Sequence, residues 1–262
     1  MFKVMNRPAF CETTIKMNND QFTKNSEETT EYILTSLFGN KQSSDIEICN
    51  SASSQQYLID ESDVENAFTK MAEKRSPGYD FISGEILKQS YTVIASVLNN
   101  LINLIFNVGH FPTCFKIGVL RLIPKQNKSC KTIKSLRPIT LLPLLGKGVE
   151  KILIDHIYRQ VFVEQKFSGC QYGFTKNRST VDAIFDAVKY IKQEMKSVPV
   201  YAVSLDITGA FDNLHWYDIV DALVLKNVHS NLINVTRSYL RNRKLIFKLN
   251  IAGYQSYRFL QK

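Results

Sequence analysis

The sequence has few cysteines and no arrangement of them that suggests a cross-link or a metal site. The five cysteines are scattered and odd in number, and no C-x-x-C pair occurs. Neither a disulfide framework nor a zinc site is therefore predicted. Reduced thiols in an intracellular, reducing compartment are the simplest interpretation, with nucleus and cytoplasm not distinguished.

Long apolar runs are also lacking. No run approaches the ~18 residues that a membrane span requires, and the N-terminal stretch lacks the apolar core of a secretory signal. We therefore expect no membrane partner. The composition, 44% hydrophobic with 11 Gly and 7 Pro, predicts a globular chain rather than a disordered or fibrous one.

Acidic residues are absent from one long stretch of this basic chain, whose formal net charge is +9. Between Glu85 and Glu150 there is no Asp or Glu, but there are nine Lys and Arg residues. Cations that neutralise phosphates bind nucleic acid without sequence preference. The alternative is a solvated cationic surface that serves solubility.

The apolar periodicity predicts helices joined to a few strands. Ser62 and Glu65 form a capping-box pattern that predicts a helix up to Lys74. Further helices are predicted at 85–107, 146–161, 180–195, 216–225 and 230–240, and strands at 116–124, 137–141, 200–207, 244–249 and 254–260. The first two strands are predicted to form a hairpin around a basic loop, and the last two to pair with each other. Ser179 is the predicted N-cap of the helix at 180–195. Residues 1–56 show a weak helical pattern only around Glu28–Phe38 and are predicted to be a poorly structured lead-in or linker.

The predicted helix at 85–107 is amphipathic. Its buried side is predicted to comprise Ile86, Leu87, Val93, Ile94, Val97, Leu98, Leu101, Ile102 and Ile105. Gly109 is predicted to end this helix.

The segment Ser204–Trp216, SLDITGAFDNLHW, carries the clearest chemical signal. Asp206 ends a predicted buried strand, small residues follow it, and Phe211 comes five positions later. A carboxylate in this position suits Mg²⁺, which prefers hard oxygen ligands and often bridges carboxylates to substrate phosphates. The alternative is an Asp that begins an ordinary strand-to-helix turn.

Five further blocks precede this segment in a fixed order. They are SPGYDFI (Ser76–Ile82), VLRLIPK (Val119–Lys125), RPITLL (Arg137–Leu142), GKGVEKIL (Gly146–Leu153) and QYGFTKNRST (Gln171–Thr180). In this order and spacing the six blocks resemble the fingers and first palm blocks of a reverse transcriptase of the non-LTR (LINE-type) retrotransposon branch. The resemblance covers roughly Tyr57 to Lys262, and it favours contact with a polyanion for the acid-free stretch.

The resemblance implies an α+β fold, the right-hand polymerase fingers with a partial palm. Residues 57–199 correspond to the fingers-like region and 200–262 to the partial palm with its first catalytic Asp. The complete relatives imply an RNA-directed DNA polymerase that uses an RNA template, a DNA primer and dNTP. They also imply Mg²⁺ or Mn²⁺ as the cofactor of a two-metal nucleotidyl transfer.

The resemblance also assigns roles to single residues. Asp206 corresponds to the first catalytic, metal-binding carboxylate, and Phe211 to the aromatic that selects deoxynucleotides; its alternative is a core aromatic. Lys125 and Arg137 correspond to the cations that grip the triphosphate of dNTP, unless they are plain surface cations. The basic residues interpreted as template contacts are Arg121, Lys128, Lys131 and Lys134.

The second carboxylate pair of the family is absent from these residues, because no adjacent Asp-Asp occurs. Asp212 is interpreted as a structural acid rather than as a substitute. We therefore expect a fragment truncated before the aromatic-x-Asp-Asp block and catalytically incomplete on its own. The alternative is a non-catalytic, nucleic-acid-binding remnant of a decayed or domesticated element.

Overall fold

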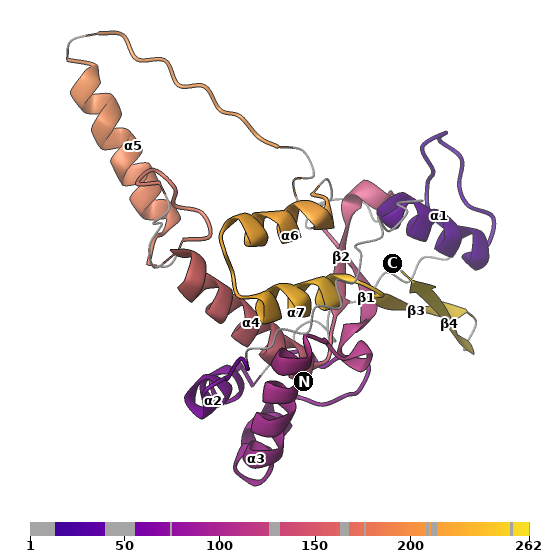
Figure 1. The fold of residues 1–262 in the computed structure, drawn as a ribbon. Helices are drawn as coiled ribbons and strands as arrows, with labels where there is room; N and C mark the ends of the chain where they lie inside the picture. The colour runs from indigo at the N-terminus through magenta and orange to yellow at the C-terminus, as the bar shows by residue number, and fades with distance from the viewer. Residues whose placement is uncertain are drawn as a thin grey trace.

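The computed structural model describes residues 14–39, 56–73, 75–125, 132–162, 168–175, 177–196, 198–207, 210, 214–251 and 254–261, with backbone alone at 248–251 and 254–261. Figure 1 shows the arrangement of their helices and strands. The helices are α1 (Ser26–Phe38), α2 (Glu61–Thr69), α3 (Gly84–Val108), α4 (Leu144–Phe162), α5 (Thr180–Glu194), α6 (Trp216–Leu225) and α7 (Ser230–Leu240). The strands are β1 (Ile117–Pro124), β2 (Leu136–Leu141), β3 (Lys244–Ile251) and β4 (Tyr254–Gln261), and two short 3-10 turns are η1 (Thr113–Lys116) and η2 (Ile133–Ser135).

The four strands form one mixed sheet in the order β2-β1-β3-β4. β1 pairs antiparallel with β2, and β3 pairs antiparallel with β4, so both predicted strand pairs are confirmed. The two hairpins are joined by a parallel pairing between β1 and β3, in which Val119 lies opposite Ile246. The sequence does not predict this join. The sheet and the helices around it agree with the predicted α+β class.

The main hydrophobic core lies among α2, α3, α4, α6 and α7. Ser83 caps α3 by accepting a hydrogen bond from the Ile86 amide, and Gly109 ends the helix in the left-handed region at φ 70°. The bounds of α3, α4, α5, α6 and α7 confirm the predicted helices to within two residues.

The predicted buried side of α3 is only partly right. Leu87, Leu98, Ile102 and Ile105 are buried, and the core also takes up Tyr91 and Phe106 from this helix. By contrast Ile86, Val93 and Val97 are 55%, 84% and 71% exposed. The helix is apolar on more than one side, and only one side faces α2, α4 and α7.

Among the described residues, α3 is also the helix that is long and apolar enough to cross a membrane, judged by length and composition alone. One such helix is weak evidence of a membrane span. The expectation that the chain has no membrane partner therefore stays a prediction.

Residues 14–39 are folded, which corrects the prediction of a poorly structured lead-in over this range. Asn25 caps α1 by accepting a hydrogen bond from the Glu28 amide. Ile15 and Ile33 are fully buried in a second cluster that includes Leu120 and Leu122 from one face of β1. The segment is ordered because this apolar contact with the sheet stabilises it. Figure 1 shows α1 beside the strands.

The predicted capping box at Ser62 is also wrong. The helix α2 starts at Glu61 with Asp60 as its N-cap, and no side chain caps it. Its position is set instead by the preceding residues: the amides of Tyr57 and Ile59 donate to the side chains of Asn107 and Asn103 in α3 at 2.8 and 2.9 Å. The start of α2 is therefore determined by hydrogen bonds to α3 and not by the capping-box pattern in the sequence.

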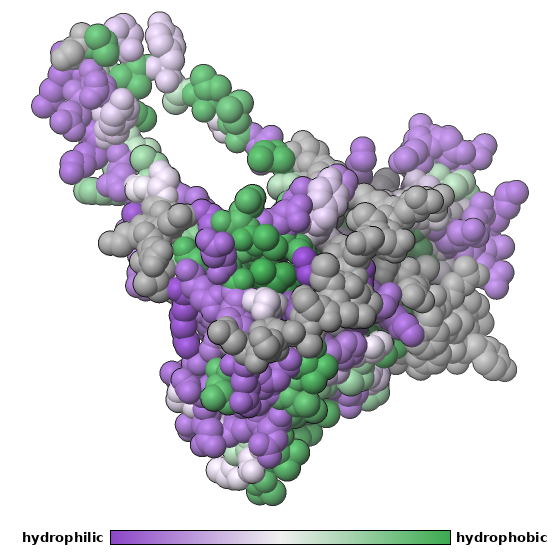
Figure 2. Space-filling view, viewed as in Figure 1, coloured by the Kyte–Doolittle hydropathy of each residue, from purple (hydrophilic) through white to green (hydrophobic). Residues whose placement is uncertain are grey.

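The predicted strand at 200–207 is not formed. The described residues of this segment run extended without a strand partner, and Tyr201, Val203 and Leu205 are 89%, 82% and 91% exposed. Figure 1 shows α5 and this segment projecting from the body, and Figure 2 shows apolar side chains along it. A strand needs a neighbour for its backbone groups, and β1 to β4 pair with one another instead.

Candidate nucleic-acid interface

Three of the predicted cations come together on one face of the β1–β2 hairpin. The register places Arg121 opposite Ile139, and Arg137 opposite Ile123. Directly opposed residues share a face of the sheet, as do residues two apart along a strand. Arg121, Arg137 and Lys125 therefore share one face, and the other face of β1 packs against α1. We call this the hairpin face.

The hydrogen bonds of Lys125 fix it at the end of the hairpin that leads into the loop between β1 and β2. Its amide donates to the carbonyl of Ser135 at 2.8 Å, which extends the ladder by one pair. Its Nζ donates to the carbonyl of Lys134 at 2.7 Å. A carbonyl does not cancel the ammonium charge. Within the described residues, Lys125, Arg121 and Arg137 form no ion pair with a carboxylate.

Two other cations of the acid-free stretch, Lys116 and Lys88, form contacts within the fold. Lys116 is buried, and its Nζ donates to the carbonyl of Ser238 in α7 at 2.8 Å. Burial, and then the charge of Arg243, lower the pKa of Lys116. Lys88 forms an ion pair of 2.8 Å with Glu73. Two more predicted template contacts, Lys128 and Lys131, lie outside the described residues.

Asp206 lies in the extended segment at 198–207 and is exposed. Within the part of the chain that the structure describes, no group of three or more His, Cys, Asp or Glu side chains could hold a metal ion. These residues therefore do not fit a two-metal centre. Phe211 and Asp212 lie outside the described residues, so their roles stay predictions.

The SPGYDFI block packs against the start of α4. A Cβ at Gly78 would lie 2.5 Å from the Pro143 nitrogen, so the backbone approaches too closely for any residue with a side chain. A Cβ at Gly146 would lie 2.9 Å from Cβ of Phe115, just before β1. Three of the blocks, at 76–82, 137–142 and 146–153, thus meet where β2 leads into α4.

The QYGFTKNRST block is attached to α5. The Tyr172 hydroxyl donates to Asp186 Oδ2 at 2.5 Å, and the Arg178 guanidinium lies 5.0 Å from the centre of the Tyr172 ring. Ser179 and Asp182 form a capping box, which confirms the predicted N-cap. Figure 1 shows α5 apart from the β1–β2 hairpin, so the structure does not bring this block to the hairpin face.

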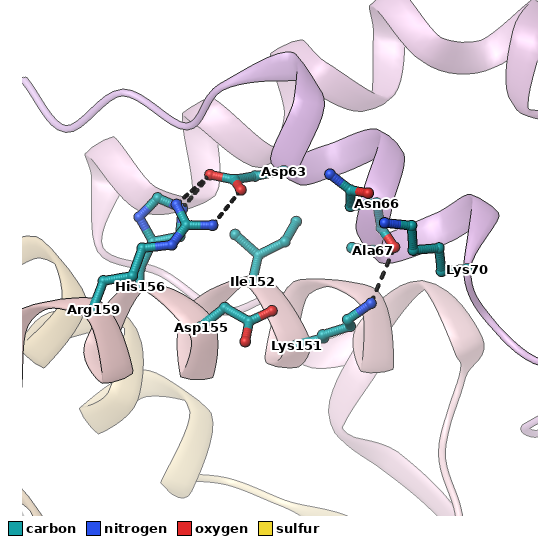
Figure 3. A pocket seen from close by; sticks show the side chains of 9 residues that line it. All are labelled: Asp63, Asn66, Ala67, Lys70, Lys151, Ile152, Asp155, His156 and Arg159. Atoms are coloured by element: carbon teal, nitrogen blue, oxygen red, sulfur yellow. Dashed lines mark hydrogen bonds and ion pairs between the residues drawn. The ribbon is translucent and has the colours of Figure 1, made fainter. Parts of the chain in front are cut away.

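Sequence reasoning misses a polar network between α2 and α4, shown in Figure 3. Asp63 Oδ2 lies 2.9 Å from His156 Nε2, and Arg159 binds both oxygens of Asp63 at 2.8 and 2.5 Å. His156 Nδ1 lies 2.9 Å from the hydroxyl of Tyr57. The members are far apart in sequence, and no local pattern links them.

The electrostatics of this network favour ionised Asp63 and neutral His156. The hydrogen bond from Arg159 lowers the pKa of Asp63, and burial opposes this shift only in part. Burial lowers the pKa of His156, although the Asp63 carboxylate acts in the opposite direction. Both groups connect α2 to α4, so the network is interpreted as structural.

The family model described as "Reverse transcriptase (RNA-dependent DNA polymerase)" matches residues 123–261, just over half of the chain. The RNA-directed DNA polymerase from mobile element jockey of Drosophila melanogaster is 27% identical over 196 residues, which is 74% of this chain and 21% of the relative. The retrovirus-related Pol polyprotein from type-1 retrotransposable element R1 of Bradysia coprophila is 30% identical over 187 residues, 71% of this chain and 18% of the relative. The chain thus spans about a fifth of the length of these curated relatives.

Proposed function

The chain belongs to the reverse transcriptase family, among the polymerases of non-LTR retrotransposons, and we propose that it supplies the nucleotide- and template-binding fingers of an RNA-directed DNA polymerase. Its partners in this role are an RNA template, a DNA primer and dNTP. The division into a fingers-like region at 57–199 and a partial palm at 200–262 is part of the proposal.

The observation that carries this proposal is the register of the hairpin, which sets Arg121, Lys125 and Arg137 on one face without carboxylate partners among the described residues. Uncompensated cations that share a face attract phosphates. Arg137 offers a planar fork to phosphate oxygens, and Lys125 a compact charge. We assign these two to the triphosphate of dNTP, and Arg121 and Lys134 to the template.

The remaining assignments follow the family pattern. Phe211 is proposed to select deoxynucleotides, and Lys128 and Lys131 to extend the template path. Reverse transcriptases generally use divalent metals, and Asp206 is proposed as one carboxylate ligand of Mg²⁺ or Mn²⁺. Because the described residues do not form a two-metal centre, the proposal for this chain rests on binding.

An intracellular, reducing compartment is proposed as its location. The free cysteines Cys114 and Cys170, both exposed, support this assignment, since exposed thiols persist most readily where disulfides are not formed.

A second candidate function is non-catalytic binding of nucleic acid. It is favoured by the exposed position of Asp206 on a segment that has no strand partner among the described residues. A carboxylate on an unsupported segment does not hold a metal in fixed geometry. Both candidates share binding through the hairpin face, and they differ in whether these residues can extend a primer.

The shared claim is tested by fluorescence anisotropy of a labelled oligouridylate against the full chain at several salt concentrations. The variant Arg121→Gln/Lys125→Gln/Arg137→Gln should bind more weakly, and its log affinity should depend less steeply on log salt by about 0.7 per lost contact. The control Lys189→Gln/Lys192→Gln/Lys196→Gln removes the same charge from exposed positions on and just after α5. Equal affinity of the hairpin variant and wild type would contradict the proposal.

A further inference from the structure

A groove runs between α2 and α4 and has none of the hairpin-face cations in its lining. It consists of two adjoining hollows of about 270 and 390 Å³, which share Ala67, Lys70, Lys151 and Asp155 as lining residues. Figure 3 shows the hollow at the Asp63 end. The larger hollow continues toward Arg75 and Lys147.

The larger hollow is rich in cations, with Lys70, Arg75, Lys147 and Lys151 in its lining. Lys151 connects α4 to α2, because its Nζ donates to the Asn66 carbonyl in the last turn of α2 at 3.0 Å. Lys70, Arg75 and Lys147 form no ion pair with any described carboxylate.

Two acids of the groove already have partners. Asp63 is paired with Arg159 and His156. Glu150 Oε1 accepts a hydrogen bond of 3.0 Å from the hydroxyl of Tyr239 in α7. Asp155 also lines both hollows. The lining of the larger hollow therefore has four cations, Lys70, Arg75, Lys147 and Lys151, against the two acids Glu150 and Asp155, so it is net positive.

Among the cations of the larger hollow, Lys147 is the one whose charged form is disfavoured by its surroundings. It is half-buried, and burial followed by the charge of Arg75 lowers its pKa, against smaller opposing effects of Glu150 and Asp80. An anion between Lys147 and Arg75 would offset both the burial of the ammonium and the repulsion between the two cations.

We propose that the α2–α4 groove binds the phosphodiester backbone of a single-stranded nucleic acid through Lys70, Arg75 and Lys147. This rests on the proposed function, which already makes the chain a nucleic-acid binder, and adds a second contact surface. The larger hollow has no aromatic lining residue on which a base could stack. Binding there goes through phosphates, so it has no sequence preference and depends strongly on salt.

The test is the anisotropy titration with a short labelled oligouridylate and the full chain. The groove variant Lys70→Gln/Arg75→Gln/Lys147→Gln is compared with wild type, the hairpin variant and the Lys189→Gln/Lys192→Gln/Lys196→Gln control. The log–log salt slope of the groove variant should be less steep than that of wild type by about 2, at about 0.7 per contact. The control should keep the wild-type slope. The single variant Lys70→Glu, at an exposed position, should weaken binding if the triple variant does not fold.

Each other result has a definite meaning. If the hairpin variant loses affinity and both groove variants bind as wild type does, the groove proposal is overturned and the proposed function stands. If wild type does not bind, both fail. If inorganic phosphate displaces the RNA more than KCl of equal ionic strength, and the groove variant abolishes this difference, the groove binds free phosphate and the strand assignment is wrong.

Discussion

Asp63 Oδ2 and His156 Nε2 lie 2.9 Å apart and join α2 to α4 across the main core. Their side chains are 13% and 9% exposed, so the contact is nearly closed to solvent. Arg159, which is largely exposed, completes the pairing of the carboxylate from the outside. These contacts hold together α2 and α4, the two helices that line the groove.

Removing the Asp63 carboxylate should destabilise the fold. Asp63→Ala leaves His156 and Arg159 without their acceptor, and hydrogen bonds to a charged group contribute about 1.5–3 kcal/mol. We expect a loss of this size in the free energy of unfolding, measured by urea denaturation. Asp221→Ala, at an exposed position in α6, is the matched control and should change stability by no more than about 0.5 kcal/mol. An equal loss of unfolding free energy in both variants would show that the network adds no more to stability than an exposed carboxylate does.

Acid should weaken the same contact. The pKa of His156 is lowered from 6.5 by burial, so the fold favours the neutral ring. This contribution to stability is fully present above pH 6.5 and is lost as pH falls toward the folded pKa. The lowered pKa of Asp63 adds a second loss below its usual value of 3.8. Urea midpoints should therefore fall as the solution is acidified.

The variant His156→Gln separates the two groups. It should flatten the fall of the urea midpoint that begins near pH 6.5 and keep the loss below pH 3.8 that belongs to Asp63. An unchanged pH profile in this variant would contradict the role given to His156.

A methyl group at Gly148 should disturb the contact of α2 with α4. A Cβ there would lie 2.2 Å from Cζ of Phe68, whose ring is 1% exposed and has no room to move. Overpacking costs about 1–3 kcal/mol, and the better helix propensity of Ala offsets only about 0.5–1 kcal/mol of it. Gly148→Ala should thus lower stability in urea, whereas Gly169→Ala, with nothing within 4 Å of its Cβ, should not.

Local patterns in the sequence predict local structure well. Gly109 and Ser179 mark helix ends as predicted, because caps satisfy backbone groups with neighbouring residues. The hairpin that carries Lys125 and Arg137 is also predicted from a local pattern, because its two strands are close in sequence.

Features that depend on distant partners are predicted poorly. The apolar run at 200–207 has the composition of a strand, but the described residues offer it no neighbour, so it stays exposed. The prediction also fails for Val93 and Val97 on the exposed side of α3. Periodicity identifies the apolar faces of a helix, but it does not show which of them packs against another element. The pairing of β1 with β3 and the contact of Asp63 with His156 join residues far apart in sequence, which no local rule connects.

A polypeptide of these 262 residues should bind a primed RNA template without extending it. The sequence contains Asp206 but no adjacent Asp pair, and two-metal nucleotidyl transfer needs carboxylates that hold both ions. Primer extension with homopolymer RNA, a DNA primer, dNTP and Mg²⁺ or Mn²⁺ measures this. Extension that is lost in Asp206→Ala would show that other residues complete the site.

The central claim is that nucleic acid binds on the hairpin face, and lysine acetylation read by mass spectrometry tests it most directly. Bound oligouridylate should protect Lys125 and Lys134 from acetylation. Lys24, which precedes α1, and Lys189 on α5 are exposed and should react equally with and without RNA. Protection of Lys24 together with unchanged reactivity of Lys125 and Lys134 would contradict the account.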